Sequence, residues 1–158
     1  MKRYLITFAA AVLLSALPAA AEGPAVAKPT HKDKCPVCGM FVAKYPDWVA
    51  ALVFKDGTLR YFDGPKDLFK FLLDLKQYAP GKGQSDVDRF FVTDYYAVRL
   101  IDGRAAYYVL GSDVYGPMGK ELIPFAREAE ARDFLKDHGG RNTLRYREIT
   151  AAVLKELD

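Results

Sequence analysis

Both cysteines of the chain fall in one hexapeptide, Cys35-Pro36-Val37-Cys38-Gly39-Met40. This hexapeptide also places a thioether two residues after the second thiol, and thiolate with thioether makes a soft ligand set. Zinc is held mainly by thiolate and imidazole, whereas Cys together with Met selects Cu(I). The residue types and their spacing therefore predict a copper-binding motif.

A further soft donor lies far along the chain, in the motif Gly116-Pro117-Met118-Gly119. Methionine usually fills a core, but one in a glycine-proline loop rather than on a periodic apolar face is a candidate ligand. In an extended segment residues i and i+2 point to the same side, so Cys38 and Met40 are expected to present their sulfurs together. The predicted metal ligands are Cys35, Cys38, Met40 and Met118.

Two other functions of the cysteine pair stay open as alternatives. A periplasmic thiol-disulfide oxidoreductase would use Cys35 and Cys38 and need neither methionine, but its cysteines are expected between a strand and a helix. A zinc-binding interaction protein would need further ligands, and His31 and His138 are the histidines of the chain. Cys35 itself could complete the site, remain a spare thiol, or form a resting disulfide with Cys38.

The first 21 residues have the pattern of a cleavable secretory signal peptide. Lys2 and Arg3 precede an apolar run over residues 5–17, and Pro18-Ala19-Ala20-Ala21 supplies the small residues of a cleavage site. A periplasmic location follows, and no lipid anchor is expected because no cysteine stands at that site. The chain has 23 basic and 20 acidic residues, and removing Lys2 and Arg3 leaves 21 basic ones. This near balance of charge gives no reason to expect nucleic acid as a partner.

Residues 22–34 are expected to form a flexible polar tail, and the rest of the chain an α+β fold. Asp63 or Gly64 is expected to cap the first helix, and His138 to end the second. Turn residues and hydrophobic periodicity predict strands over 48–54, 58–62, 90–96, 105–110, 121–125 and 144–149, with helices over 65–75, 127–138 and 150–157.

The order of these elements repeats. Sliding the chain along itself aligns one set of apolar residues with a second set, at the end of a strand and inside the following helix. The pairs are Leu59 with Leu122, Phe62 with Phe125, Phe71 with Phe134, and Leu72 with Leu135. We predict two small, related ββαβ units, residues 35–100 with the cysteine motif and 101–158 with the Gly-Pro-Met-Gly loop and a terminal helix. Chance similarity between two amphipathic helices is the alternative.

The motifs, in this order, resemble the NosL family. They are Cys-Pro-x-Cys-Gly-Met near the mature N-terminus, a tryptophan strand, Phe62-Asp63 before a helix, Gly116-Pro117-Met118-Gly119, and His138-Gly139-Gly140. The resemblance spans essentially the whole mature chain and implies a fold of two homologous ββαβ domains.

That resemblance implies a periplasmic Cu(I)-binding metallochaperone and not an enzyme. Its partners would be a copper-accepting apo-enzyme, nitrous oxide reductase in this family, and a copper donor or membrane transporter. Many family members are lipoproteins, and this chain departs from them with Ala20-Ala21-Glu22 where the acylated cysteine would stand. The departure leaves open a copper client other than nitrous oxide reductase.

Overall fold

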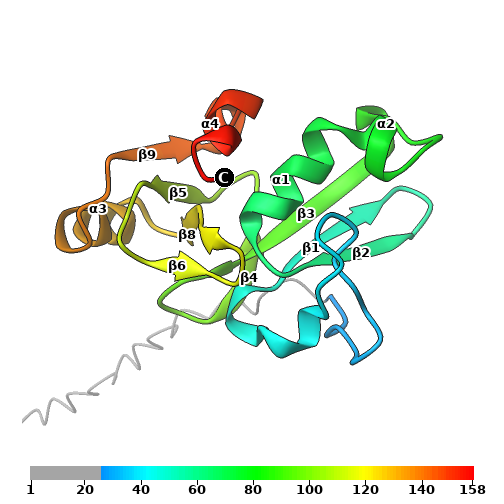
Figure 1. Cartoon of the computed structure of the whole chain (residues 1–158), viewed down its shortest axis with the longest axis horizontal. Helices are drawn as coiled ribbons and strands as arrows, with labels where there is room; N and C mark the ends of the chain where they lie inside the picture. The colour runs from blue at the N-terminus through cyan, green and yellow to red at the C-terminus, as the bar shows by residue number, and fades with distance from the viewer. Residues whose placement is uncertain (1–25) are drawn as a thin grey trace, which may run out of the picture.

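The computed structural model describes residues 26–158 (Figure 1). The predicted signal peptide, residues 1–21, and residues 22–25 of the predicted tail lie outside the described residues. Within the described part, none of the helices has the length and apolar character needed to cross a membrane.

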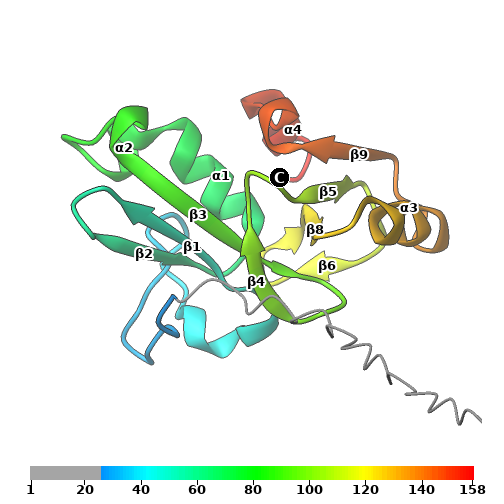
Figure 2. The same ribbon diagram turned by 180° about the vertical axis from the view of Figure 1, so that it is seen from behind.

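The first sheet is antiparallel, with strand order β2-β1-β3-β4. Its strands are β1 (Ala50–Phe54), β2 (Leu59–Phe62), β3 (Val87–Asp94) and β4 (Arg99–Asp102). The predicted Asp56-Gly57 turn joins β1 to β2, with Gly57 at a φ of +84° and its amide 2.9 Å from the carbonyl oxygen of Phe54. Between β2 and β3 the chain forms α1 (Pro65–Leu73), α2 (Leu75–Tyr78) and the short 3₁₀ turn η3 (Gln84–Asp86), and α1 packs on the sheet (Figures 1 and 2).

The second sheet repeats this arrangement with strand order β8-β5-β9. It consists of β5 (Tyr107–Leu110), β8 (Ile123–Phe125) and β9 (Asn142–Arg145), with α3 (Glu128–Asp137) between β8 and β9. The order matches β2-β1-β3, which confirms the predicted α+β fold of two related ββαβ units. β4 has no counterpart in the second sheet. The predicted boundary between the two units, between residues 100 and 101, falls within this strand.

The aligned phenylalanines occupy equivalent places in the two units. Phe62 ends β2 and Phe125 ends β8, while Phe71 lies in α1 and Phe134 in α3. All four side chains are fully buried. The phenylalanines that repeat in the sequence therefore occupy equivalent core positions in the two units.

Outside the two sheets lie short elements that complete the molecule. They are the 3₁₀ turns η1 (Val42–Lys44), η2 (Pro46–Trp48) and η4 (Tyr146–Glu148), the helix α4 (Ala151–Lys155), and the hairpin of β6 (Tyr115–Gly116) with β7 (Gly119–Lys120). Met118 lies in the turn of this hairpin.

Several predicted boundaries are wrong. The third strand spans Val87–Asp94 rather than 90–96. The first helix ends at Leu73 rather than at 75, because the side chain of Asp74 accepts the Gln77 amide at 3.1 Å and begins α2. Trp48 lies in η2 before the first strand, and the last strand ends at Arg145, where η4 begins. The side chain of Thr150 does cap the terminal helix, accepting the Val153 amide.

The two units pack against each other. The backbone amide of Tyr95, just after β3, donates to the carbonyl oxygen of Pro124 in β8 at 2.9 Å. Trp48 and Tyr95 from the first unit pack against the apolar cluster of the second, and Tyr108 from β5 lies in the core of the first. Side chains on one unit can therefore be held in place by the other.

Candidate metal centre

The cysteine hexapeptide forms a closed turn. The Cys35 amide donates to the carbonyl oxygen of Met40, and the Gly39 amide donates to that of Cys35, both at 2.9 Å. Gly39 adopts a φ of +79°, a left-handed conformation that glycine reaches without steric cost. The expected extended segment is wrong, because the chain reverses at Gly39. The reversal instead brings Cys38 back toward Cys35.

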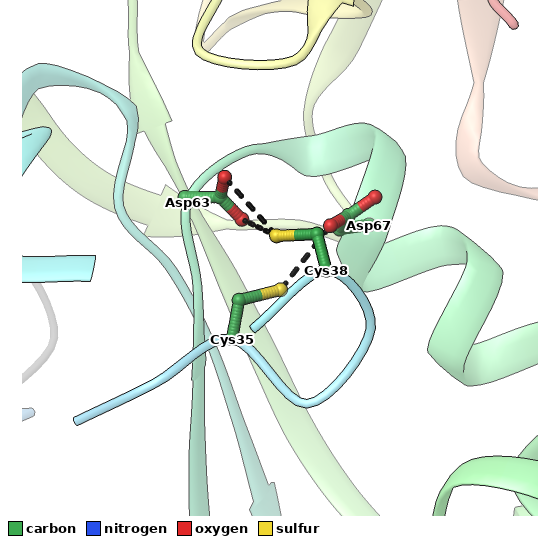
Figure 3. Close-up of side chains that lie close together, drawn as sticks. All are labelled: Cys35, Cys38, Asp63 and Asp67. Atoms are coloured by element: carbon green, nitrogen blue, oxygen red, sulfur yellow. Dashed lines mark hydrogen bonds between the residues drawn. The ribbon is translucent and has the colours of Figure 1, made fainter. Parts of the chain in front are cut away.

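Two carboxylates face the two thiols (Figure 3). The Cys35 Sγ donates to Oδ2 of Asp67 at 3.2 Å, and the Cys38 Sγ donates to Oδ1 of Asp63 at 3.2 Å. One ligand atom from each of the four residues lies within 4.8 Å of the others. This is the one group of three or more His, Cys, Asp or Glu residues in the described part of the chain that could hold a metal ion.

The sequence prediction misassigned one of these carboxylates and missed the other. The N-cap of α1 is Gly64, without a side-chain cap hydrogen bond, and Asp63 directs its carboxylate to a thiol instead of capping the helix. Asp67 lies in the first turn of α1. Asp63 precedes the N-cap Gly64, whose backbone is extended, so the spacing of Asp63 and Asp67 follows no helical period that could have revealed the pair.

Burial divides the site into a closed inner side and an open outer side. Cys35 is 1% exposed and Asp63 and Asp67 are also buried, whereas Cys38 is half-buried. Burial raises the pKa of the Cys38 thiol to about 12, and hydrogen bonds to the carboxylates add to the rise. The pKa of Cys35 is raised further, again mainly by burial and then by the charge of Asp67. Both residues are therefore protonated thiols near neutral pH.

The two predicted methionines lie on different elements. Met40 follows Gly39 directly and is half-buried. Met118 is 44% exposed in the turn between β6 and β7, and its carbonyl oxygen accepts a hydrogen bond from Nζ of Lys66 at 2.9 Å. Lys66 directly precedes Asp67 in α1. The structure therefore brings the hairpin of the second unit to the end of α1 whose carboxylates face the thiols.

Neither histidine joins this group among the described residues. His31 is exposed in the segment before the cysteine turn. His138 is the C-cap of α3, as predicted, with Nδ1 3.0 Å from Oδ1 of Asp113 and its ring stacked on Phe134. A zinc site of the thiolate and imidazole kind would therefore lack its imidazoles here.

Known proteins resemble this chain over most of its length. The profile of the NosL family matches residues 26–154. The copper-binding lipoprotein NosL of Stutzerimonas stutzeri is 35% identical over 130 residues, which cover 78% of this chain and 65% of that relative. The chain thus spans slightly less than two thirds of that relative's length.

One solved structure has the same fold. The crystal structure of the copper chaperone NosL from Shewanella denitrificans matches with a TM-score of 0.68 at 28% identity, covering 80% of this chain and 96% of that one. The first relative is named as a copper-binding protein and the second as a copper chaperone, and neither is named as an enzyme.

Proposed function

The chain belongs to the NosL family, and we propose that it is a periplasmic metallochaperone that binds Cu(I) and passes it to a copper enzyme. The observation that supports this proposal is the hydrogen bond from Lys66 to the backbone carbonyl of Met118, made at the same end of α1 where Asp67 accepts the Cys35 thiol. Soft sulfur donors converging from separate loops suit Cu(I). The client we expect is nitrous oxide reductase, and the relatives' names support carriage of copper rather than catalysis.

The ligands in this proposal are the sulfurs of Cys35, Cys38, Met40 and Met118. The carboxylates of Asp63 and Asp67 are hard donors that do not favour Cu(I) over other ions. Their role is to fix the two thiol groups by hydrogen bonds. Binding one Cu(I) between the two cysteines releases two thiol protons, so the loaded site carries one more negative charge beside these carboxylates than the empty one.

Release of copper would begin at the open side of this site. Cys35 is buried while Cys38 is half-buried and Met118 is 44% exposed. An incoming ligand of a partner protein can reach the exposed thioether first and then displace the sulfurs in turn. A site that keeps an accessible position exchanges its ligands, whereas a closed four-ligand cage is typical of structural metal sites.

The ligand assignment is tested by anaerobic competition of the reduced protein against a chromophoric Cu(I) chelator. Cys38→Ser, Met40→Ala and Met118→Ala are each expected to weaken Cu(I) binding by about tenfold or more, because each removes a soft donor. The exposed Leu73→Ala, on α1 but absent from the site, is the control and is expected to bind like the wild type. Unchanged affinity in all three ligand variants would overturn the assignment.

The same preparations separate the two alternative functions. A zinc-binding protein would bind Zn(II) with an affinity that the methionine variants leave unchanged. A thiol-disulfide oxidoreductase would reduce a protein disulfide stoichiometrically and need only Cys35 and Cys38. We expect neither result.

Delivery and location are tested separately. Cu(I)-loaded protein is expected to restore activity to copper-free nitrous oxide reductase. When a Cu(I) chelator is present in this assay, Met118→Ala protein is expected to lose most of its copper to the chelator.

The relative from Stutzerimonas stutzeri is named a lipoprotein, whereas both cysteines of this chain lie in the hexapeptide. We therefore expect cell fractionation to recover this protein with the periplasmic fraction, after cleavage near residue 21.

A further inference from the structure

Lys66 is a buried lysine whose ammonium group contacts two distant parts of the chain. The residue is 3% exposed, and Nζ donates to the carbonyl oxygens of Met118 at 2.9 Å and Leu157 at 3.2 Å. Nζ also lies 4.0 Å from Oδ1 of Asp158. A buried ammonium is costly unless its donors are satisfied, so these carbonyls must stay in place around it. The side chain thus ties the Met118 hairpin and the C-terminus to α1.

Glu121 makes a second connection between α1 and the β6–β7 hairpin. It directly follows β7 and is 3% exposed, and its Oε1 accepts the backbone amides of Lys66 at 2.6 Å and Leu122 at 2.8 Å. Two glycines leave room for this side chain: a Cβ at Gly64 would collide with Oε2, and one at Gly116 would lie 3.1 Å from Cγ. The hairpin is therefore fixed at its turn by the Lys66 side chain and at its end by the Lys66 backbone.

The start of α1 organises all parts of the sulfur site. Asp63 accepts the thiol of Cys38, and Asp67 accepts the thiol of Cys35. Lys66, between these two carboxylates in sequence, holds the backbone of Met118. One end of one helix thus contacts the cysteine turn on one side and the methionine hairpin on the other.

We propose that Lys66 and Glu121 are positioning residues, which hold the β6–β7 hairpin so that the Met118 sulfur reaches the thiols of Cys35 and Cys38. This inference rests on the proposed function, in which Met118 is a Cu(I) ligand. Neither residue needs to touch the metal. They act through the backbone of the hairpin, which these hydrogen bonds hold against α1.

The test compares Cu(I) affinity and the number of sulfur neighbours of bound copper, from X-ray absorption, across a set of variants. Lys66→Met keeps the length of the side chain and removes its donors. Lys70→Met is the matched control, because Lys70 lies one turn further along α1 and its ammonium pairs with Asp158 at 2.5 Å, whereas that of Lys66 donates to Met118. Glu121→Ala removes the second connection and serves as an independent variant if Lys66→Met does not fold.

We expect Lys66→Met and Glu121→Ala each to weaken Cu(I) binding by about 10- to 100-fold, as supporting residues of metal ligands typically do. Bound copper should then have one sulfur neighbour fewer, and Lys70→Met should match the wild type. In a Met118→Ala background neither substitution should weaken binding further, because the ligand that they position is already absent.

Three results distinguish the possible failures. Wild-type affinity and a full sulfur count in folded Lys66→Met and Glu121→Ala would overturn the positioning role and leave the proposed function intact. Losses of Cu(I) affinity in Lys66→Met or Glu121→Ala that add to the loss in Met118→Ala would also overturn the positioning role, because they would show an effect independent of Met118. Wild-type affinity in the Met118→Ala single variant would remove Met118 from the ligand set and would overturn the positioning role with it.

Discussion

Cys38 carries its proton at neutral pH, because burial and the neighbouring carboxylates raise the pKa of its thiol to about 12. Cys35 is more deeply buried, and its pKa is raised further. A thiolate and not a thiol binds the metal, so each cysteine that binds Cu(I) must release its proton. The high pKa values therefore make Cu(I) affinity depend on pH.

We predict that the apparent Cu(I) affinity rises by about 100-fold per pH unit between pH 6 and pH 8, because each thiol that gives up its proton contributes about tenfold. Competition with a chelator whose own affinity is known at each pH measures this slope. Cys35→Ser should reduce the slope to about tenfold per unit. A slope of zero in the wild type would contradict thiolate binding, and a slope unaffected by Cys35→Ser would remove Cys35 from the ligand set.

The cysteine turn is the element whose shape the site depends on most directly. Gly39 has a φ of +79° and Gly57, in the β1–β2 turn, a φ of +84°, and a Cβ at either position would meet no atom within 4 Å. The two glycines therefore differ in location and not in local crowding. A side chain at either one introduces backbone strain alone.

We predict that Gly39→Ala and Gly57→Ala each lower the unfolding free energy by about 1 kcal/mol, the usual cost of the left-handed conformation for a residue with a Cβ. Only Gly39→Ala should also weaken Cu(I) binding, because relaxing its backbone moves Cys38 and Met40 relative to Cys35. Urea unfolding and chelator competition measure the two effects. Equal Cu(I) affinities in the two variants would contradict a role of the turn geometry in the site.

Glu121 is buried between the hairpin and α1, and burial raises its pKa to about 8 even though two backbone amides and the charge of Lys66 oppose the rise. In the unfolded chain the pKa returns to about 4.3, the value of a free glutamate. The folded protein therefore binds this proton more readily than the unfolded chain. The resulting stabilisation is complete below the unfolded pKa and is lost as the pH rises through the folded pKa.

We predict that the unfolding free energy of the wild type falls by a few kcal/mol between pH 5 and pH 8, at about 1.4 kcal/mol per unit of pKa difference. Glu121→Gln, which keeps an oxygen for the two amides and cannot ionise, should lack this part of the decline. Urea unfolding at several pH values, with and without the substitution, tests this. Parallel curves for the two proteins would show that Glu121 is ionised in the same way in both states.

The elements were more predictable from sequence than the contacts of the site. Phe62, Phe71, Phe125 and Phe134 recur at periodic positions, and such periodicity follows directly from which face of an element is buried. In contrast, the hydrogen bond from Cys35 to Asp67 joins residues 32 positions apart, and that from Lys66 to Met118 spans 52 positions. No local pattern encodes such a contact, because the packing of the two units decides it. Methionine and cysteine spacing therefore predicts candidate soft donors, but it does not predict the carboxylates that accept the thiols or the lysine that donates to the Met118 carbonyl.

At the scale of the whole molecule, the two ββαβ units share their cores. Tyr108 of the second unit is fully buried beside Phe69 of α1, with ring centroids 5.1 Å apart. Trp48 of the first unit packs beside Tyr95 against the cluster that contains Phe125 and Phe134. The proposed Cu(I) site would draw its cysteines from one unit and Met118 from the other, so the packing between units would set the distance between its sulfurs.

Phe134 tests whether the units unfold together. It is fully buried in α3, with its ring centroid 5.0 Å from those of Phe125 and Tyr95. We predict that Phe134→Ala lowers the unfolding free energy by about 3–5 kcal/mol, the usual cost of removing a buried ring. Because the cores are shared, amides of β1 and β5 should lose protection from hydrogen exchange in one transition.

The control for this experiment is Leu73→Ala, since Leu73 is exposed on α1 and its loss should change stability by no more than about 0.5 kcal/mol. Exchange of β5 while β1 stays protected would show that the second unit opens alone. Such an opening would carry Met118 away from Cys38 without disturbing the cysteine turn, and Cu(I) would then be held by the first unit only. A single transition means instead that the position of Met118 is maintained by the stability of the entire fold, and Phe134→Ala should weaken Cu(I) binding only under conditions that begin to unfold it.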